Sequence, residues 1–296
     1  MREDRTSNMI DKAFIEKTDL ELIEQDIPLH ARPFRVMVGW MRAKGLSGDL
    51  FASEMWRPLM MVYKQLYPSG DFAMPSLFIG GVGLRDRIYL ARVNVAFGRD
   101  AVDPIKCIDI PSSELEIIWK QNPNQVWRAI YSVADLWDFA YGIDDLKGQN
   151  CDADQLWINA RSSIVSSART LAGGHDLSSV VQSSCLSVEL AMKGTLAFLG
   201  LPEPKRRKLN HNLVNLAEAI ISYYPTANGA CLRLACSTFP EYIQTRYESH
   251  GLTRIQLIAL AMRSQFVAAE VLRLVSGRNL AGEIESGHQS PPREDI

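Results

Sequence analysis

The segment SCLSVELAMKGTLAFLGLPEPKRRKLNHNL, residues 184–213, joins a strongly apolar helical pattern to a basic turn that carries a histidine. Glu189 and Lys193 stand four residues apart in the apolar part, which places both side chains on one face of a helix. A buried charge without a partner costs several kcal/mol. The pair is therefore either an ordinary ion pair on a half-exposed face or part of a larger pattern.

The chain around this segment is helical from residue 152 onward. Gly, Pro or Asn residues stand at each break (GGHD, LPEP, YPTANG and SHGL), as is typical of helix ends. The predicted helices span 152–172, 176–200, 207–223, 229–243 and 252–276. Apolar residues three and four positions apart predict the core of an antiparallel bundle. These residues are Val188, Met192, Leu196, Leu213, Leu216, Leu257, Leu260 and Val267.

For the first half of the chain, the sequence predicts a smaller α+β unit. Amphipathic helices are expected over 32–44 and 53–66, and SLFIGGVGLRDRIYLARVNVAFGRD (76–100) predicts a β-hairpin with GGVG as its turn. A third strand could follow at 104–110. With a polar boundary near 148, the fold class is α+β. The predicted divisions are a flexible N-terminus (1–30), an α+β domain of unknown role (31–148), a helical bundle (149–278) and a disordered tail (279–296).

Four aspartates mark the helix that precedes the boundary. Asp135, Asp138, Asp144 and Asp145 lie on or just past it. Paired carboxylates can hold Mg²⁺, but the sequence has no second acidic cluster, so we expect a solvated acidic face. We expect no metal and no cofactor.

Composition favours a soluble, cytoplasmic protein of one or two domains. The 296 residues include five scattered cysteines, which predict reduced core residues rather than disulfides. The sequence has no run of 18 or more apolar residues, so we expect no membrane span. Residues 201–278 hold ten Lys or Arg against five Asp or Glu. That modest local excess favours a solvated basic surface, with contact to a polyanion such as RNA as the alternative.

The helical half resembles the HEPN domain family, which consists of small bundles of four to five helices. Glu189, Lys193 and Leu196 match the "E-L-A-x-K-x-x-L" pattern of the family's second helix. His211 opens a segment that matches "H-x-L-x-x-L". The pair Arg246-Tyr247 matches the "R-Y" before the last helix. The resemblance covers 152–276 and implies a functional or dimer-facing groove at Glu189, Lys193, His211 and Tyr247.

Many HEPN proteins are metal-independent ribonucleases that act as homodimers, and the resemblance implies a catalytic pair at Arg246 and His250. An imidazole can transfer protons and a guanidinium can stabilise the phosphorane. Three residues separate this pair, where the family has four to six. The family spacing itself occurs at Arg169…His175 and Arg206…His211, both at other turns.

These observations leave three functions open. The first is RNA or partner binding in a defence or toxin–antitoxin system, with a possible protein partner bound through 31–148. The second is a metal-independent endoribonuclease, and the third is a non-enzymatic dimerisation module. The residues expected to contact RNA are Lys205, Arg206, Arg207, Lys208 and Arg254.

Overall fold

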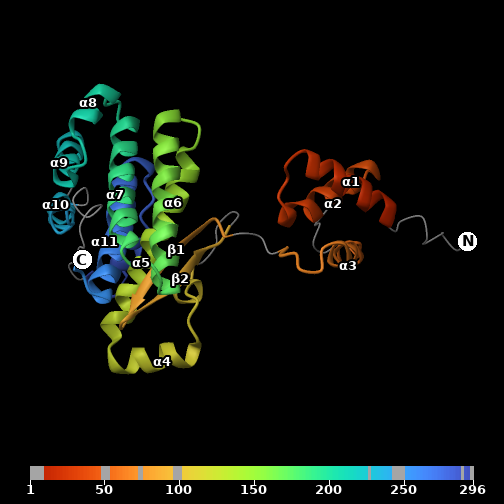
Figure 1. The fold of residues 1–296 in the computed structure, drawn as a ribbon, viewed down its shortest axis with the longest axis horizontal. Coiled ribbons are helices and arrows are strands. Elements are labelled where there is room, and N and C mark those ends of the chain that lie inside the picture. Colours follow the sequence, from red (N-terminus) through yellow and green to blue (C-terminus); the bar gives the residue numbers. More distant parts are fainter. Residues whose placement is uncertain are drawn as a thin grey trace, which may run out of the picture. The chain divides into compact units, whose positions relative to one another are not determined.

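The structure is a computed structural model that describes residues 10–47, 54–72, 76–95, 102–225, 228–241, 251–287 and 290–293. The chain separates into two compact units, residues 1–75 and 76–296. Figure 1 shows helices in the first unit, and the hairpin with the remaining helices in the second. The division lies more than 70 residues before the predicted boundary near 148, because the hairpin packs on the helical bundle that follows it.

In the described part of the N-terminal unit, all regular secondary structure is helical. It consists of α1 (Lys12–Glu24), a short 3-10 turn, α2 (Arg32–Ala43) and α3 (Trp56–Leu66). The two amphipathic helices predicted here are confirmed. The flexible N-terminus predicted for 1–30 is wrong from Lys12 onward, since Ile15 and Leu22 are buried in the core of this unit. Charged residues surround these two positions in the sequence, so the pattern there did not indicate a helix.

The second unit begins with the predicted hairpin, formed by β1 (Phe78–Leu84) and β2 (Arg87–Val93). Leu84 pairs with Arg87, so the turn is Arg85–Asp86 and the predicted turn at GGVG is wrong. Arg85 takes the positive φ, 56°, that a two-residue hairpin turn demands. The glycines instead lie inside β1, where helices approach closely.

Three glycines of β1 allow this approach. A Cβ at Gly80 would lie 2.2 Å from Leu136, and a Cβ at Gly83 would lie 2.6 Å from Ile258. At Gly81 the backbone exchanges two hydrogen bonds of 2.8 Å with the side-chain amide of Gln265. The amide thus satisfies backbone groups of β1 that β2 does not reach.

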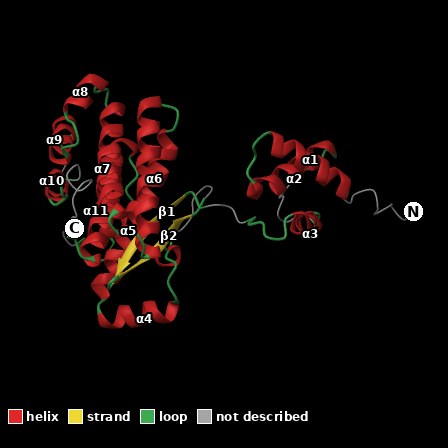
Figure 2. Ribbon diagram, viewed as in Figure 1, coloured by secondary structure: helices red, strands yellow, loops and turns green. Residues whose placement is uncertain are grey.

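The segment after the hairpin leads to the bundle. Residues 104–110 form a 3-10 turn (Pro104–Cys107) and a single bridge between Ala91 and Ile108, in place of the predicted third strand. The helix α4 (Ser112–Gln121) follows, and Figure 2 shows it lying across one end of the bundle.

Four long helices form the core of the second unit: α5 (Pro123–Leu146), α6 (Cys151–Gly173), α7 (Ser179–Phe198) and α11 (Arg254–Ser276). Trp157 of α6 packs against Gly194 of α7, where a Cβ would lie 2.6 Å from the indole. All eight predicted core residues are buried, as expected.

The direction of these helices follows from contacts at their ends. Asn150, which caps α6, bonds to the carbonyl of Ala197 at the end of α7, so α6 and α7 are antiparallel, as predicted. Thr195 near the end of α7 bonds to the carbonyl of Val271 near the end of α11. These two helices therefore run in the same direction, which the predicted antiparallel bundle did not include.

Short helices connect α7 to α11 and close the chain. The predicted helix 207–223 is two helices, α8 (Glu203–Lys208) and α9 (Leu213–Tyr223), because Asn210 takes a positive φ of 53° between them. They are followed by α10 (Gly229–Ser237). The predicted disordered tail instead forms α12 (Leu280–Glu285), and the described residues after it, 290–293, return to the bundle.

One helix of the described residues, α11, is long and apolar enough to cross a membrane. Of its most apolar window, 72% is buried inside the unit, which is the pattern of a core helix. Its burial is weak support for a soluble protein. A cytoplasmic location stays a prediction.

Candidate functional site

The half-exposed cluster, which we define as Glu189, Lys193 and His211, brings together three residues of the predicted groove. The Nζ of Lys193 lies 2.7 Å from Oε1 of Glu189. The Nδ1 of His211 lies 3.0 and 2.9 Å from the two carboxylate oxygens. The Glu189 side chain is 5% exposed and the His211 side chain 46% exposed. A buried carboxylate therefore holds a cation and an imidazole at the edge of the solvent.

Local structure positions these three side chains. The α7 helix puts Glu189 and Lys193 one turn apart on one face. His211 stands just before α9, whose N-cap Asn212 accepts a hydrogen bond from the backbone N–H of Asn215. The positive φ of Asn210 ends α8 and turns the chain toward α7.

This arrangement is suited to proton transfer. A carboxylate only accepts hydrogen bonds, so the network assigns the donating N–H to Nδ1 of His211 and leaves Nε2 as the basic nitrogen. Lys193 adds a positive charge at the same carboxylate.

Arg206 differs from the other cations of KRRK because it is buried. Its guanidinium donates to the carbonyl of Leu201 at 2.7 Å and to the carboxylate of Asp152 at 2.9 Å. It joins the loop after α7 to the first turn of α6. Because these donors hold the end of the bundle together, Arg206 is less suited to contact RNA than its exposed neighbours, and that contact stays a prediction.

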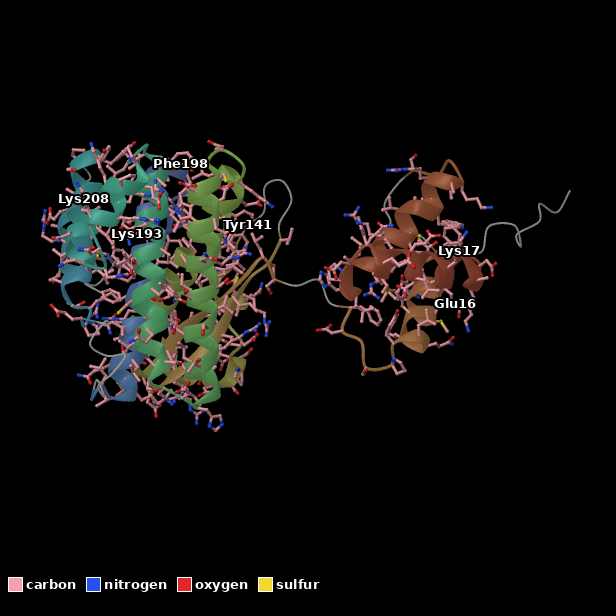
Figure 3. The ribbon with its side chains drawn as sticks, turned by 45° about the horizontal axis from the view of Figure 1, so that its top comes forward. Glu16, Lys17, Tyr141, Lys193, Phe198 and Lys208 are labelled. Carbon is pink, nitrogen blue, oxygen red and sulfur yellow. The ribbon has the colours of Figure 1, made fainter. Side chains whose placement is uncertain are left out.

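The remaining cations predicted to bind RNA lie at two ends of the unit. Lys205, Arg207 and Lys208 are exposed on α8. Figure 3 shows Lys193 on α7 and Lys208 on α8 among the side chains of this unit. Arg254 instead donates to the carbonyls of Leu171 and Asp86 at the far end of α6.

The length of α6 measures how far apart these sites are. Asp152, which binds Arg206, and Leu171, which binds Arg254, are separated by about 28 Å at 1.5 Å per helical residue. Arg254 and the cations of α8 therefore cannot contact the same phosphate. The other three predicted residues, Arg246, His250 and Tyr247, lie outside the described residues.

A second ionic site was not predicted from the sequence. In this sealed cluster, which we define as Asp135, Asp138, Glu270, Arg273 and Arg293, the guanidinium of Arg273 lies 2.6 Å from Asp135, 2.7 Å from Asp138 and 3.1 Å from Glu270. Arg293 binds Asp135 as well. The predicted solvated face is therefore wrong for both aspartates, which are 1% and 2% exposed.

Backbone and amide groups complete the sealed cluster. Asp138 accepts from the backbone N–H groups of Leu280 and Ala281 in the first turn of α12. Asn228 donates to Glu270 at 2.8 Å. The spacing of Glu270 and Arg273 on α11 was a signal for an ion pair. The partners of Arg273 on α5 gave no such signal, because 135 or more residues separate them from Arg273 in the sequence.

The two aspartates respond differently to burial. Burial would raise the pKa of Asp135, but Arg293 and Arg273 outweigh it and hold the pKa below its ordinary value. Burial dominates at Asp138, so the pKa of that carboxyl is raised although Arg273 and the α12 backbone oppose the shift. Since the cluster already supplies two guanidinium groups to its carboxylates, its chemistry is that of a structural ion network rather than a cation site.

A scan against protein-family models finds no match for this sequence, and searches of the curated proteins and of the solved structures find no match either.

Proposed function

We propose that this is a HEPN-like protein of a defence or toxin-type system that binds RNA at the half-exposed cluster and the adjoining face of α8. One observation carries the proposal: the buried carboxylate of Glu189 holds Lys193 and His211 together at the solvent edge. These are the groove residues that the resemblance to the HEPN family implies. The family assignment is part of the proposal.

The charges around the cluster support RNA as the ligand. Lys205, Arg207 and Lys208 lie on α8, which ends three residues before His211. Lysine and arginine side chains on one short helix contact phosphates without reading the base sequence. We therefore expect binding that tolerates sequence changes in the RNA and weakens as salt rises.

The second candidate function is a metal-independent endoribonuclease, which the orientation of His211 favours. In that reaction Nε2 of His211 takes the proton of the 2′-hydroxyl while the 2′-oxygen attacks the phosphorus. The bond from phosphorus to the 5′-oxygen breaks, and that oxygen gains a proton from an acid. The predicted pair Arg246 and His250 is retained as the alternative source of the acid and of charge stabilisation.

A cleavage and binding assay on the full chain tests both functions. Labelled RNA is incubated with the protein in EDTA, and binding is measured over a range of salt concentrations. The variants are His211→Ala, Glu189→Gln, Arg246→Ala, His250→Ala and a double variant that carries Lys205→Gln and Lys208→Gln. The control is Lys120→Gln, an exposed lysine at the end of α4.

We expect the double variant to bind RNA roughly tenfold more weakly and the control to bind unchanged. The dependence of the double variant's affinity on salt should fall by an amount that corresponds to about two phosphate contacts. Cleavage that survives EDTA and fails in His211→Ala would establish the ribonuclease. Absence of both binding and cleavage would leave the interaction module, with a protein partner bound through 31–148, as the function. The expected homodimer is tested by light scattering, since the chain mass is 33.2 kDa.

A further inference from the structure

Residues 290–293, of sequence SPPR, dock on the second unit as a short segment without regular secondary structure. The hydroxyl of Tyr131 donates to the carbonyl of Pro291 at 2.7 Å, and the backbone N–H of Arg293 donates to the carboxylate of Glu285 at 3.2 Å. Proline fixes its own φ, and a residue that precedes a proline is disfavoured in the α region. The sequence of the segment therefore favours the extended polyproline II conformation, which leaves main-chain groups available to a partner.

The arginine of this segment occupies a site that suits a guanidinium. Its guanidinium lies 4.5 Å from the ring centroid of Phe266 and 5.5 Å from that of Tyr131. It also donates to the carboxylate of Asp135 at 2.8 Å. Aromatic faces and a carboxylate both attract this planar cation. The side chain of Arg293 is 17% exposed, against 8% for Arg273, so Arg293 is the outer of the two guanidinium groups at Asp135.

Tyr131, which holds the segment, is the end of a row of three aromatic side chains. The ring centroid of Trp127 lies 6.5 Å from that of Tyr131 and 6.2 Å from that of Trp119. Tyr131 is 3% exposed, whereas Trp119 at the opposite end of the row is 40% exposed. Grooves lined by aromatic side chains are the usual docking sites of proline-rich segments in the polyproline II conformation. The row offers further ring surface to a longer segment of this kind.

A groove of about 530 Å³ lies beside the segment, where β1, α5 and α11 meet. This volume is within the range of ligand sites in proteins, about 300–1,000 Å³. Apolar walls come from α5, from α11 and from the prolines of the segment. They include Trp127, Ile255, Ile258, Met262, Pro291 and Pro292. Because the groove is open with the segment in place, a longer peptide can contact apolar surface that residues 290–293 do not fill.

We propose that this surface is a docking site for a proline-rich protein segment that contains Pro-Pro-Arg, and that residues 290–293 occupy it as an internal ligand. The arginine of the partner replaces Arg293 at Asp135, so the charge balance of the sealed cluster is unchanged. A proline carbonyl of the partner accepts the hydrogen bond from Tyr131, and further prolines follow the aromatic row toward Trp119. This docking site goes beyond the RNA-binding function proposed above.

Tethering gives the internal segment an effective concentration in the millimolar range, on the order of that found for short linkers, so it masks the site. Release of the segment should therefore reveal binding. The released variant carries Pro291→Ala, Pro292→Ala and Arg293→Gln at unchanged chain length. A second variant carries only the two proline substitutions and keeps the ion pair with Asp135, in case loss of that pair prevents folding. Circular dichroism checks that each variant is folded.

Fluorescence anisotropy with labelled peptides measures binding to the full chain and to both variants. The probes are SPPR and two extended peptides, PPPSPPR and SPPRPPP, and the control peptides replace the arginine by glutamine or the prolines by alanine. Two further substitutions are made in the released variant. Tyr131→Phe removes the hydroxyl donor, and Ala259→Trp fills the groove from an exposed position of α11. The matched control is Tyr223→Phe, at an exposed tyrosine of α9.

We expect the released variant to bind the tighter of the two extended peptides roughly tenfold or more tightly than the unaltered chain does, with the second variant between them. The control peptides should bind roughly tenfold more weakly. Tyr131→Phe should weaken binding roughly fivefold, as for the loss of one hydrogen bond, and Tyr223→Phe should not change it. Ala259→Trp should reduce the affinity for the extended peptides to that for SPPR.

Three results would overturn the inference. A folded released variant that binds none of the peptides would exclude the docking site, and equal binding by the unaltered chain and both variants would show that residues 290–293 do not occupy it. Equal affinity for SPPR and both extended peptides would exclude a role for the open groove. RNA binding through α8 should be the same in the released variant, so this proposal and the proposed function can fail separately.

Discussion

The sealed cluster and the half-exposed cluster are both carboxylate–cation sites on helices of one unit, and they differ in how far they open to solvent. In the sealed cluster the Arg273 side chain is 8% exposed and contacts three acidic residues. In the half-exposed cluster the carboxylate of Glu189 is equally hidden, but the imidazole of His211 is not. The half-exposed cluster therefore presents an imidazole at the edge of the solvent.

This difference separates structure from function. Charges that are mutually satisfied and shielded from water join elements distant in sequence, here α5, α11 and the segment after α12. A charge cluster with an open side can exchange protons or bind an anion. The comparison predicts that the two clusters respond to substitution in different observables, which are folding stability for the first and imidazole chemistry for the second.

The largest expected effect is on stability, from Arg273→Met in the sealed cluster. Removal of this guanidinium leaves three buried acidic groups with one cation, which should lower the free energy of unfolding by about 3–5 kcal/mol. Urea unfolding followed by circular dichroism measures the loss. Arg278→Met is the matched control, because Arg278 pairs with Asp145 in solvent and should cost less than about 1 kcal/mol. Equal losses of unfolding free energy in the two variants would mean that burial does not make the sealed cluster more important for stability than an exposed ion pair.

The pH dependence of stability should reveal the two aspartates separately. Asp135 has a lowered pKa in the folded state, so its contribution is present above about pH 4, the unfolded value, and is lost as the pH falls further. Asp138 has a raised pKa, so it opposes this trend above about pH 4. Asp135→Asn should therefore flatten the acid-induced loss of unfolding free energy, and Asp138→Asn should steepen the rise in stability with pH. Urea titrations between pH 2.5 and 7 compare the slopes, and identical slopes in both variants would contradict these assignments.

The same comparison explains which parts could be predicted from the sequence. Helical periodicity predicted α7 and its buried face because each helix repeats its pattern locally. The pair Glu189 and Lys193 was visible for the same reason. His211 was assigned to the same groove only through the resemblance to the HEPN family. No local sequence pattern predicts that the turn after α8 packs against α7.

The sealed cluster could not be predicted because its partners come from three distant segments. Asp135 and Asp138 read as surface residues until Arg273 and Arg293 are placed beside them. The glycines of β1 show the same limit. GGVG matches a turn by composition, and only the positions of Leu136 and Ile258 show that it serves close packing.

A smaller effect is expected in the half-exposed cluster from Glu189→Gln. The amide still accepts a hydrogen bond but loses its charge, so the cost in stability should be about 2 kcal/mol, as for a hydrogen bond to a charged group. The informative change is in His211, whose Nδ1–H tautomer depends on the carboxylate. Nitrogen NMR of the histidine ring should show a shift toward the Nε2–H tautomer. An unchanged tautomer would mean that another group orients the imidazole.

The smallest effects are expected within KRRK (205–208), where Arg206 is buried and its neighbour Arg207 is exposed. Arg206→Gln removes bonds to Leu201 and Asp152 and should lower the unfolding free energy by about 1–2 kcal/mol. Arg207→Gln removes an exposed pair with Glu203 and should change it by less than about 0.5 kcal/mol. For RNA binding we expect the opposite order of effects, because an exposed cation that contacts a phosphate releases counterions from the RNA. Arg207→Gln should then lower the salt dependence of the affinity by about one charge. If Arg206→Gln lowered the salt dependence without loss of stability, the buried arginine would be a phosphate contact after all.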